Sequence, residues 1–138
     1  MKKNLVASIS SVVYVVWGLL HLQAAAAVYR LGGTLESGML QGRMIQHAWN
    51  LLFASVFAIA IAVTLNWRNT RQGYWINTFL VGIVDLGFIL FVLIPGYLPL
   101  MPGILGPAAW LIAWVLSTIA YLQKSREGRN SPLSRLPG

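Results

Sequence analysis

The chain has 138 residues, of which 57% are hydrophobic and only 9% charged, and its formal net charge is +7. Water-soluble domains carry about a quarter charged residues, so this composition indicates a membrane protein and argues against a soluble one. The sequence contains no cysteine, which excludes disulfides, thiolate metal sites and dithiol redox chemistry.

Four apolar segments follow one another along the chain, with polar or charged residues between them. They run from Leu5 to Tyr29, Met44 to Leu65, Tyr74 to Leu98 and Leu105 to Leu122. A helix needs about 20 residues to cross the ~30 Å hydrocarbon core of a bilayer. The sequence therefore predicts an all-α fold, a bundle of four transmembrane helices in residues 1–123, followed by a basic, disordered tail in residues 124–138.

The first segment also has the features of a secretory signal. Lys2 and Lys3, the apolar run and the alanines at positions 24–27 match the pattern of a cleaved leader. The run from Leu5 to Leu22 is longer than the usual ~7–15 residues of such a leader. We therefore expect a retained first helix; cleavage would leave three spans and remove His21.

In the second segment, Ala54, Ala58 and Ala62 recur every four residues and predict a face for close helix packing. Between the third and fourth segments, the loop from Pro95 to Pro107 contains four prolines and three glycines but no charge. This composition predicts a proline-kinked helix end and turn, and the alternative is a hydrophobic lid over a pocket.

The basic residues define the expected orientation. Only Arg30 and Arg43 lie on one side of the predicted membrane, and the other eight share the opposite side: Lys2, Lys3, Arg68, Arg71, Lys124, Arg126, Arg129 and Arg135. By the positive-inside rule, both termini are cytoplasmic in a bacterial-type inner membrane. This distribution favours lipid headgroups over nucleic acid as the partner of the positive charge.

Asp85 is the only acidic residue within the four apolar segments and lies near the middle of the third. An ionisable group at that depth costs about 3 kcal/mol or more, so it indicates function. From the ~1.5 Å rise per residue, His21, His47 and Asn50 are expected in the same outer half of the bundle. Arg43, His47 and Asn50 also share one helix face. The sequence predicts one polar pocket, and the simplest alternative is a set of interhelical hydrogen bonds that only fix the packing.

Two chemistries would use the histidines as ligands. Two imidazoles and a carboxylate can bind a divalent metal, although these three residues lack the usual clustered spacing. A single imidazole in aromatic surroundings can bind haem iron. His47 is the better candidate because Trp49, Phe53 and Phe57 on its own helix offer flat apolar surface.

Several positions also form a pattern along spans two to four and the loop before them: Leu31-Gly32-Gly33 with Glu36, Gly42-Arg43 leading to His47, Asp85 in the third span, and Gly106-Pro107 before the fourth. This pattern resembles the styrene oxide isomerase family. Those proteins are small bacterial membrane enzymes with four helices that bind haem b through one histidine of the second helix.

The resemblance implies that His47 binds haem b, whose iron polarises an epoxide oxygen as a Lewis acid. It places Asp85 beside a small apolar substrate, to orient it or to stabilise positive charge at the opening carbon, and Asn50 as a substrate-positioning residue. The family's asparagine and tyrosine after this aspartate correspond here to Ile89 and Leu93. This departure puts epoxide isomerisation itself in question.

Two other functions remain open. In a proton-coupled transporter, Asp85 would exchange protons with a substrate, with His21 or His47 as a relay. In a non-catalytic subunit, the alanine face would assemble with a larger membrane complex. Because the chain has no large soluble part, we expect a homo-oligomer or a subunit in either case.

Overall fold

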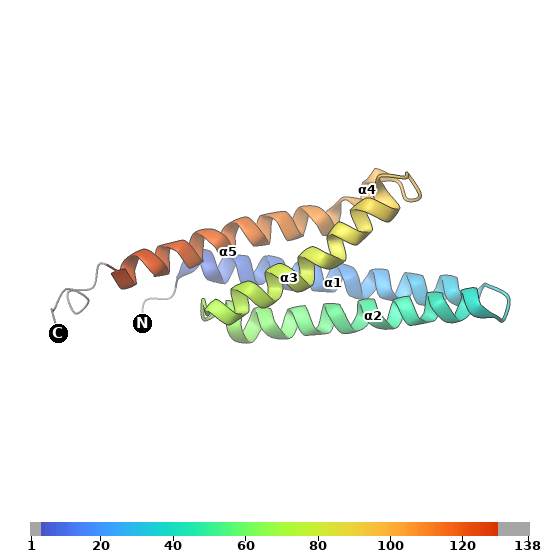
Figure 1. The fold of residues 1–138 in the computed structure, drawn as a ribbon, viewed down its shortest axis with the longest axis horizontal. Helices are drawn as coiled ribbons and strands as arrows, with labels where there is room; N and C mark the ends of the chain where they lie inside the picture. Colours follow the sequence, from blue (N-terminus) through green and yellow to red (C-terminus); the bar gives the residue numbers. More distant parts are fainter. Residues whose placement is uncertain (1–3, 130–138) are drawn as a thin grey trace.

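The computed structural model describes residues 4–129 as a bundle of helices along one long axis (Figure 1). The elements in chain order are α1 (Leu5–Gly33), α2 (Met39–Ile61), η1 (Ala62–Asn66), α3 (Arg71–Phe88), η2 (Ile89–Leu93), α4 (Leu100–Gly103) and α5 (Leu105–Arg129). The π-helical turns η1 and η2 prolong α2 and α3. Four helices are therefore long and apolar enough to cross a membrane. The all-α prediction and its four long helices are confirmed.

The helices extend beyond the predicted apolar segments. α1 continues to Gly33 at the far end of its span, and α5 continues to Arg129. Residues 124–129, expected in a disordered tail, are thus helical, because lysine, arginine and glutamate favour helix wherever the preceding turns supply the carbonyl acceptors. Residues 130–138 of that tail, and Lys2 and Lys3 of the topology prediction, lie outside the described residues.

Both ends of the described chain lie at the same end of the bundle, together with the turn between α2 and α3 (Figure 1). We call this the terminal end and the opposite one the distal end. α1 packs along α2 and α5, whereas α3 crosses the bundle obliquely. It starts beside α2 at the terminal end and finishes beside α4 and α5 at the distal end (Figure 1).

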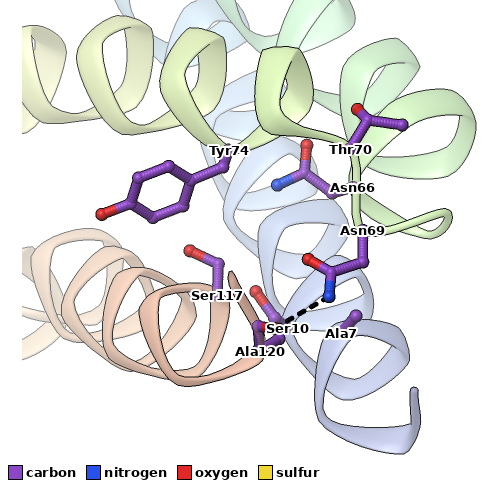
Figure 2. Close-up of a pocket in the computed structure, with 8 residues that line it drawn as sticks. All are labelled: Ala7, Ser10, Asn66, Asn69, Thr70, Tyr74, Ser117 and Ala120. Atoms are coloured by element: carbon purple, nitrogen blue, oxygen red, sulfur yellow. Dashed lines mark hydrogen bonds between the residues drawn. The ribbon is translucent and has the colours of Figure 1, made fainter. Parts of the chain in front are cut away.

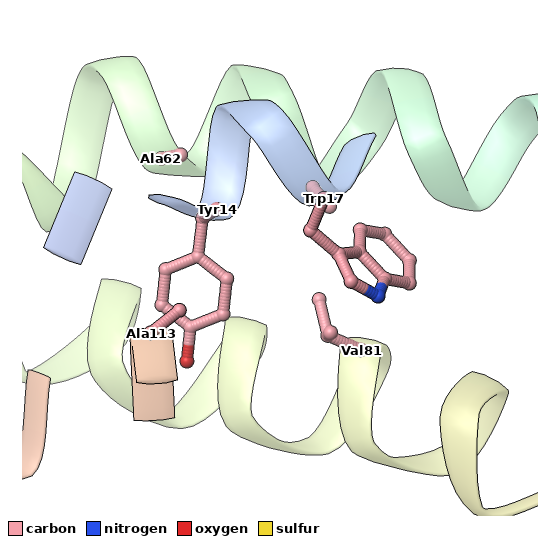
Figure 3. Packing of buried hydrophobic residues seen from close by; sticks show 6 residues of the cluster. Tyr14, Trp17, Ala62, Val81 and Ala113 are labelled. Carbon is pink, nitrogen blue, oxygen red and sulfur yellow. The ribbon is translucent and has the colours of Figure 1, made fainter. Parts of the chain in front are cut away.

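The core lies where the four long helices meet. Its fully buried residues are Tyr14 and Trp17 of α1, Ala58 and Ala62 of α2 and η1, Val81 of α3 and Ala113 of α5 (Figure 3). α1 supplies the two large rings, and the other helices present small side chains to them. Ala54, Ala58 and Ala62 are all buried, as the predicted packing face requires.

The loop from Pro95 to Pro107 forms a turn after η2, the single turn of α4 and the start of α5. Gly96 adopts a positive φ of 75°, which only glycine adopts readily. Gly103 is buried against Leu93 and Leu98, so the loop folds back on the end of its own helix. The predicted kinked helix end and turn is confirmed.

Gly73 allows α3 to start directly against η1. A Cβ atom at this position would lie 2.8 Å from the backbone nitrogen of Asn66 and from the carbonyl carbon of Leu65, and backbone atoms cannot yield as side chains do. We expect Gly73→Ala to lower the free energy of unfolding by about 1–3 kcal/mol. Circular dichroism during titration with sodium dodecyl sulfate in mixed micelles measures it.

Gly87 is the matched control, because it lies on the same helix and a Cβ there would meet no atom within 4 Å. Gly87→Ala should leave stability unchanged or raise it by up to about 1 kcal/mol through helix propensity. Equal stability of the two variants would contradict the close contact between α3 and η1.

Candidate functional site

Asp85 is completely buried and faces two aromatic side chains of α1. The Trp17 Nε1–H group donates a hydrogen bond of 2.6 Å to Asp85 Oδ2. His21 Nε2 lies 3.5 Å from Asp85 Oδ1. Trp17 and His21 are one helical turn apart, and their rings stack with centroids separated by 3.9 Å. The two stacked rings therefore bring a nitrogen atom to each oxygen of the same carboxyl group.

The hydrogen bonds fix the position of one proton on His21. His21 Nδ1 lies 2.9 Å from the backbone carbonyl oxygen of Trp17, and because a carbonyl only accepts, Nδ1 must carry a hydrogen. A neutral His21 would then turn an unprotonated Nε2 towards Asp85, and a lone pair would face a carboxylate. The contact is favourable only if one further proton resides on Nε2 or on Asp85. The His21–Asp85 contact can therefore hold one proton between the two side chains.

Asp85 Oδ1 has no hydrogen-bond partner among residues 4–129. The 3.5 Å to His21 Nε2 exceeds the usual 2.7–3.2 Å of such a bond. A buried carboxyl oxygen without a donor is costly, and in native proteins it commonly marks a catalytic group or the place of an unseen water or ion. Oδ1 is therefore the atom of this site that is free to bind a proton or a ligand.

The start of α5 closes the site from the other side. A Cβ atom on Gly106 would lie 2.8 Å from His21 Cε1 and 3.6 Å from Asp85 Oδ1, so only a glycine fits without displacing the imidazole. Gly106 belongs to the first turn of α5, whose partial positive charge favours a negative carboxylate nearby. The Pro95–Pro107 segment thus ends against the His21–Asp85 pair.

The structure brings together only part of the predicted pocket. His21 and Asp85 meet, but Arg43, His47 and Asn50 are exposed on α2. The physical reason is the tilt of α3, which leaves α2 towards the distal end and carries Asp85 to α1 and α5 (Figure 1). The position of a residue along its helix axis follows from the sequence. It does not determine which neighbouring helix packs against that face.

This separation also bears on the metal hypothesis. Among the described residues there is no group of three or more histidine, cysteine or acidic side chains that could hold a metal ion. His47, the third expected ligand, is exposed while the other two are buried. The geometry of a single chain does not fit a site with two histidines and one carboxylate.

Trp17 is the member of the site that sequence reasoning missed. Its indole is fully buried and supplies the only hydrogen bond that Asp85 accepts within residues 4–129. The signal was the spacing of Trp17 and His21, which places both rings on one face of the first helix. A tryptophan at membrane depth has one N–H to satisfy, and a carboxyl on a neighbouring helix is a suitable acceptor.

A separate open groove runs between α1 and α2 near the distal end, with a volume of ≈ 430 Å³. Its walls are mostly apolar: Leu22, Ala25, Ala26, Tyr29, Arg30, Ile45, Ala48, Trp49 and Leu52. The size suits a small apolar ligand. His47 is not among its lining residues, so the groove and the exposed imidazole are distinct features.

Fold and site together define the class of protein as a four-helix bundle of the multi-pass membrane type, with a buried ionisable pair near the middle of its helices. No family model matches the chain, and no curated protein and no solved structure matches it. The resemblance to the styrene oxide isomerase family therefore stays a prediction.

Proposed function

We propose that this chain is a proton-coupled transporter of a bacterial-type inner membrane, with its terminal end in the cytoplasm and the His21–Asp85 pair as its proton-binding site. The four long apolar helices support the membrane location, and the basic residues near the terminal end support the orientation. The observation that carries the proposal is the 3.5 Å contact between His21 Nε2 and Asp85 Oδ1, which brings two ionisable side chains together inside the bundle.

The pair suggests a small organic cation as the transported species. Asp85 Oδ1 can accept a proton or a positively charged group, but not both at once, and such exclusive binding couples two fluxes. His21 is its ionisable neighbour, whereas Trp17 and Gly106 carry no charge, so a cation can replace the proton of the pair without meeting a fixed positive side chain there. Because Gly106 covers the pair, a substrate reaches Asp85 only after the start of α5 moves away.

The test is proton flux in proteoliposomes that contain a trapped fluorescent pH indicator and an acidic interior. Tetramethylammonium and tetraethylammonium are suitable probes, since both keep their charge at every pH and neither crosses a bilayer readily without a protein. Adding either probe outside should raise the internal pH only in liposomes that contain the protein. Proton movement that ignores every cation added, or no movement at all, would refute coupled transport.

His47 supports a second candidate, a protein that binds haem. Its ring is exposed, unlike that of His21, and the same helix carries exposed aromatic surface in Trp49 and the stacked pair Phe53 and Phe57. Residues 4–129 would thus offer one imidazole to the iron and no opposing wall, so a haem pocket would need a second copy of the chain. When bound there, haem would supply a Lewis-acid iron. The single chain does not place Asp85 beside that iron.

An absorption spectrum tests this candidate. If haem binds at His47, protein purified after haem-replete expression shows a Soret band, and His47→Ala removes that band because the iron loses its axial ligand. His21→Gln is the matched control and should keep the band, since His21 is buried beside Asp85. A colourless wild-type protein would exclude the haem candidate and leave the transport proposal untouched.

A further inference from the structure

Four more buried polar atoms lack hydrogen-bond partners among the described residues. Trp110 Nε1 lies beside Gly82 of α3. The other three lie nearer the terminal end than the His21–Asp85 pair, and they are the Tyr14 hydroxyl, Thr78 Oγ1 and Asn77 Oδ1. Tyr14 precedes His21 by seven residues on α1, and Thr78 precedes Asp85 by seven on α3, so both lie about 10 Å nearer the terminal end. Buried polar groups without hydrogen-bond partners, gathered at one height along a helix bundle, are typical of a site for bound water.

A small cavity lies next to this level, at the terminal end of the bundle (Figure 2). It leaves ≈ 10 Å³ for the centres of water molecules, about the space that one water needs. Its lining is largely polar and uncharged: Ala7, Ser10, Asn66, Asn69, Thr70, Tyr74, Ser117 and Ala120. Asn69 and Thr70 belong to the turn between η1 and α3, so the cavity reaches the end of the bundle where the helices meet the aqueous phase.

The cavity and the orphaned atoms are connected. Ser117 lines the cavity, and it and Thr78 are the polar neighbours of the Tyr14 hydroxyl, although neither lies in hydrogen-bond geometry with it. Asn66 also lines the cavity, and its Oδ1 accepts a weak hydrogen bond of 3.4 Å from Asn77 Nδ2. Polar groups therefore continue from the surface turn through Ser117 to Tyr14, and a second set of polar groups runs from Asn66 to Asn77.

Beyond Tyr14, an apolar layer interrupts the polar groups. Val81 and Ala113 are fully buried there together with the indole of Trp17 (Figure 3). Trp17 is also the residue whose N–H donates to Asp85 Oδ2. A hydrogen bond to a charged carboxylate is roughly twice as strong as one to a neutral carboxyl. Protonation of Asp85 would therefore weaken the hydrogen bond that holds the Trp17 indole in this layer.

We infer that these polar residues form a water-lined access path by which protons travel between the terminal end and Asp85. Tyr14 is the last hydroxyl of the path, and the layer of Trp17, Val81 and Ala113 is the barrier that closes it in this conformation. The inference rests on the proposed function, because it explains how protons reach the His21–Asp85 pair without charged side chains along the way.

Hydroxyl-radical labelling by short X-ray pulses, with oxidised residues identified by mass spectrometry, tests for the water without any assumption about transport. Tyr14 and Trp17 are both 0% exposed, so they form a matched pair in one helix. Bound water should make Tyr14 react while Trp17 stays unmodified, although an indole is at least as reactive as a phenol. An unlabelled Tyr14 would overturn the access path.

The second arm measures proton flux in the proteoliposome assay. Tyr14→Phe keeps the ring but removes the hydroxyl, and it should slow the flux about tenfold. Tyr97→Phe removes a hydroxyl from a ring that is 80% exposed and lines neither the cavity nor the groove, and it should have no effect. A labelled Tyr14 with undiminished flux in Tyr14→Phe would overturn the path as a proton route. Absent flux in the wild type would refute transport, and the labelling result would still decide whether the water is there.

Discussion

Asp85→Asn should abolish cation-driven proton release and leave the helical fold intact. Asparagine has the shape of aspartate, and its carbonyl oxygen can still accept the hydrogen bond that Trp17 donates at 2.6 Å in the wild type. Its amide, however, does not bind and release a proton, and its NH₂ group can satisfy His21 Nε2 permanently. In the proteoliposome assay we expect the flux to fall by about 100-fold or more, the usual effect of removing a proton-transferring group.

The thermal stability of Asp85→Asn should not fall with its proton flux. Asparagine keeps the shape of the carboxyl, can accept the hydrogen bond from Trp17 and can donate one to His21 Nε2, so no buried polar group is left without a partner. Thermal unfolding of Asp85→Asn should therefore begin at the wild-type temperature or above it. A large loss of stability together with the loss of flux would mean that Asp85 supports the packing and that the change in flux is indirect.

Glu36→Gln is the matched control for charge. Glu36 lies in the exposed loop between α1 and α2, and the substitution changes the net charge by the same amount. Full flux is expected in this variant. If Asp85→Asn also kept full flux, the proton site would be excluded, and a non-catalytic role in a larger membrane complex would become the better explanation.

The sequence was sufficient to predict the four long apolar helices, because a helix that crosses a membrane needs a hydrophobic length set by the membrane thickness. It also placed His21 and Asp85 at a common depth, since the rise per residue is the same in every helix. The helix ends were less predictable. α5 runs on to Arg129 because hydrogen bonding along a helix does not stop where the apolar residues do.

The pocket was predicted only in part, and the reason lies in helix orientation. Hydropathy and spacing place His47 at a depth close to that of His21, but the path of α3 decides which helix Asp85 meets. That path depends on contacts between residues far apart in the chain, such as Gly73 against Leu65 and Asn66, or Gly106 against His21. No periodicity within one segment contains this information.

Trp17→Ala should be the most destabilising single substitution in the bundle. The indole is fully buried, stacks on His21 and belongs to the core cluster at the meeting of the four long helices. Its removal leaves a large cavity and should lower the free energy of unfolding by about 3–5 kcal/mol. Trp49 is the matched control because its ring is 66% exposed, and Trp49→Ala should change stability by less than about 0.5 kcal/mol. Titration with sodium dodecyl sulfate, followed by circular dichroism, compares the two variants.

Trp17→Phe separates packing from hydrogen bonding at the same position. Phenylalanine fills most of the indole volume but has no N–H group, so Asp85 Oδ2 loses its donor. If the carboxyl of Asp85 is charged, removing this hydrogen bond should lower the free energy of unfolding by about 1.5–3 kcal/mol, more than a hydrogen bond between neutral groups contributes. If the proton already resides on Asp85, the bond joins neutral groups and should contribute only about 0.6 kcal/mol, as interhelical bonds do on average in membranes. The stability of Trp17→Phe relative to wild type therefore reports on which partner of the His21–Asp85 pair holds the proton.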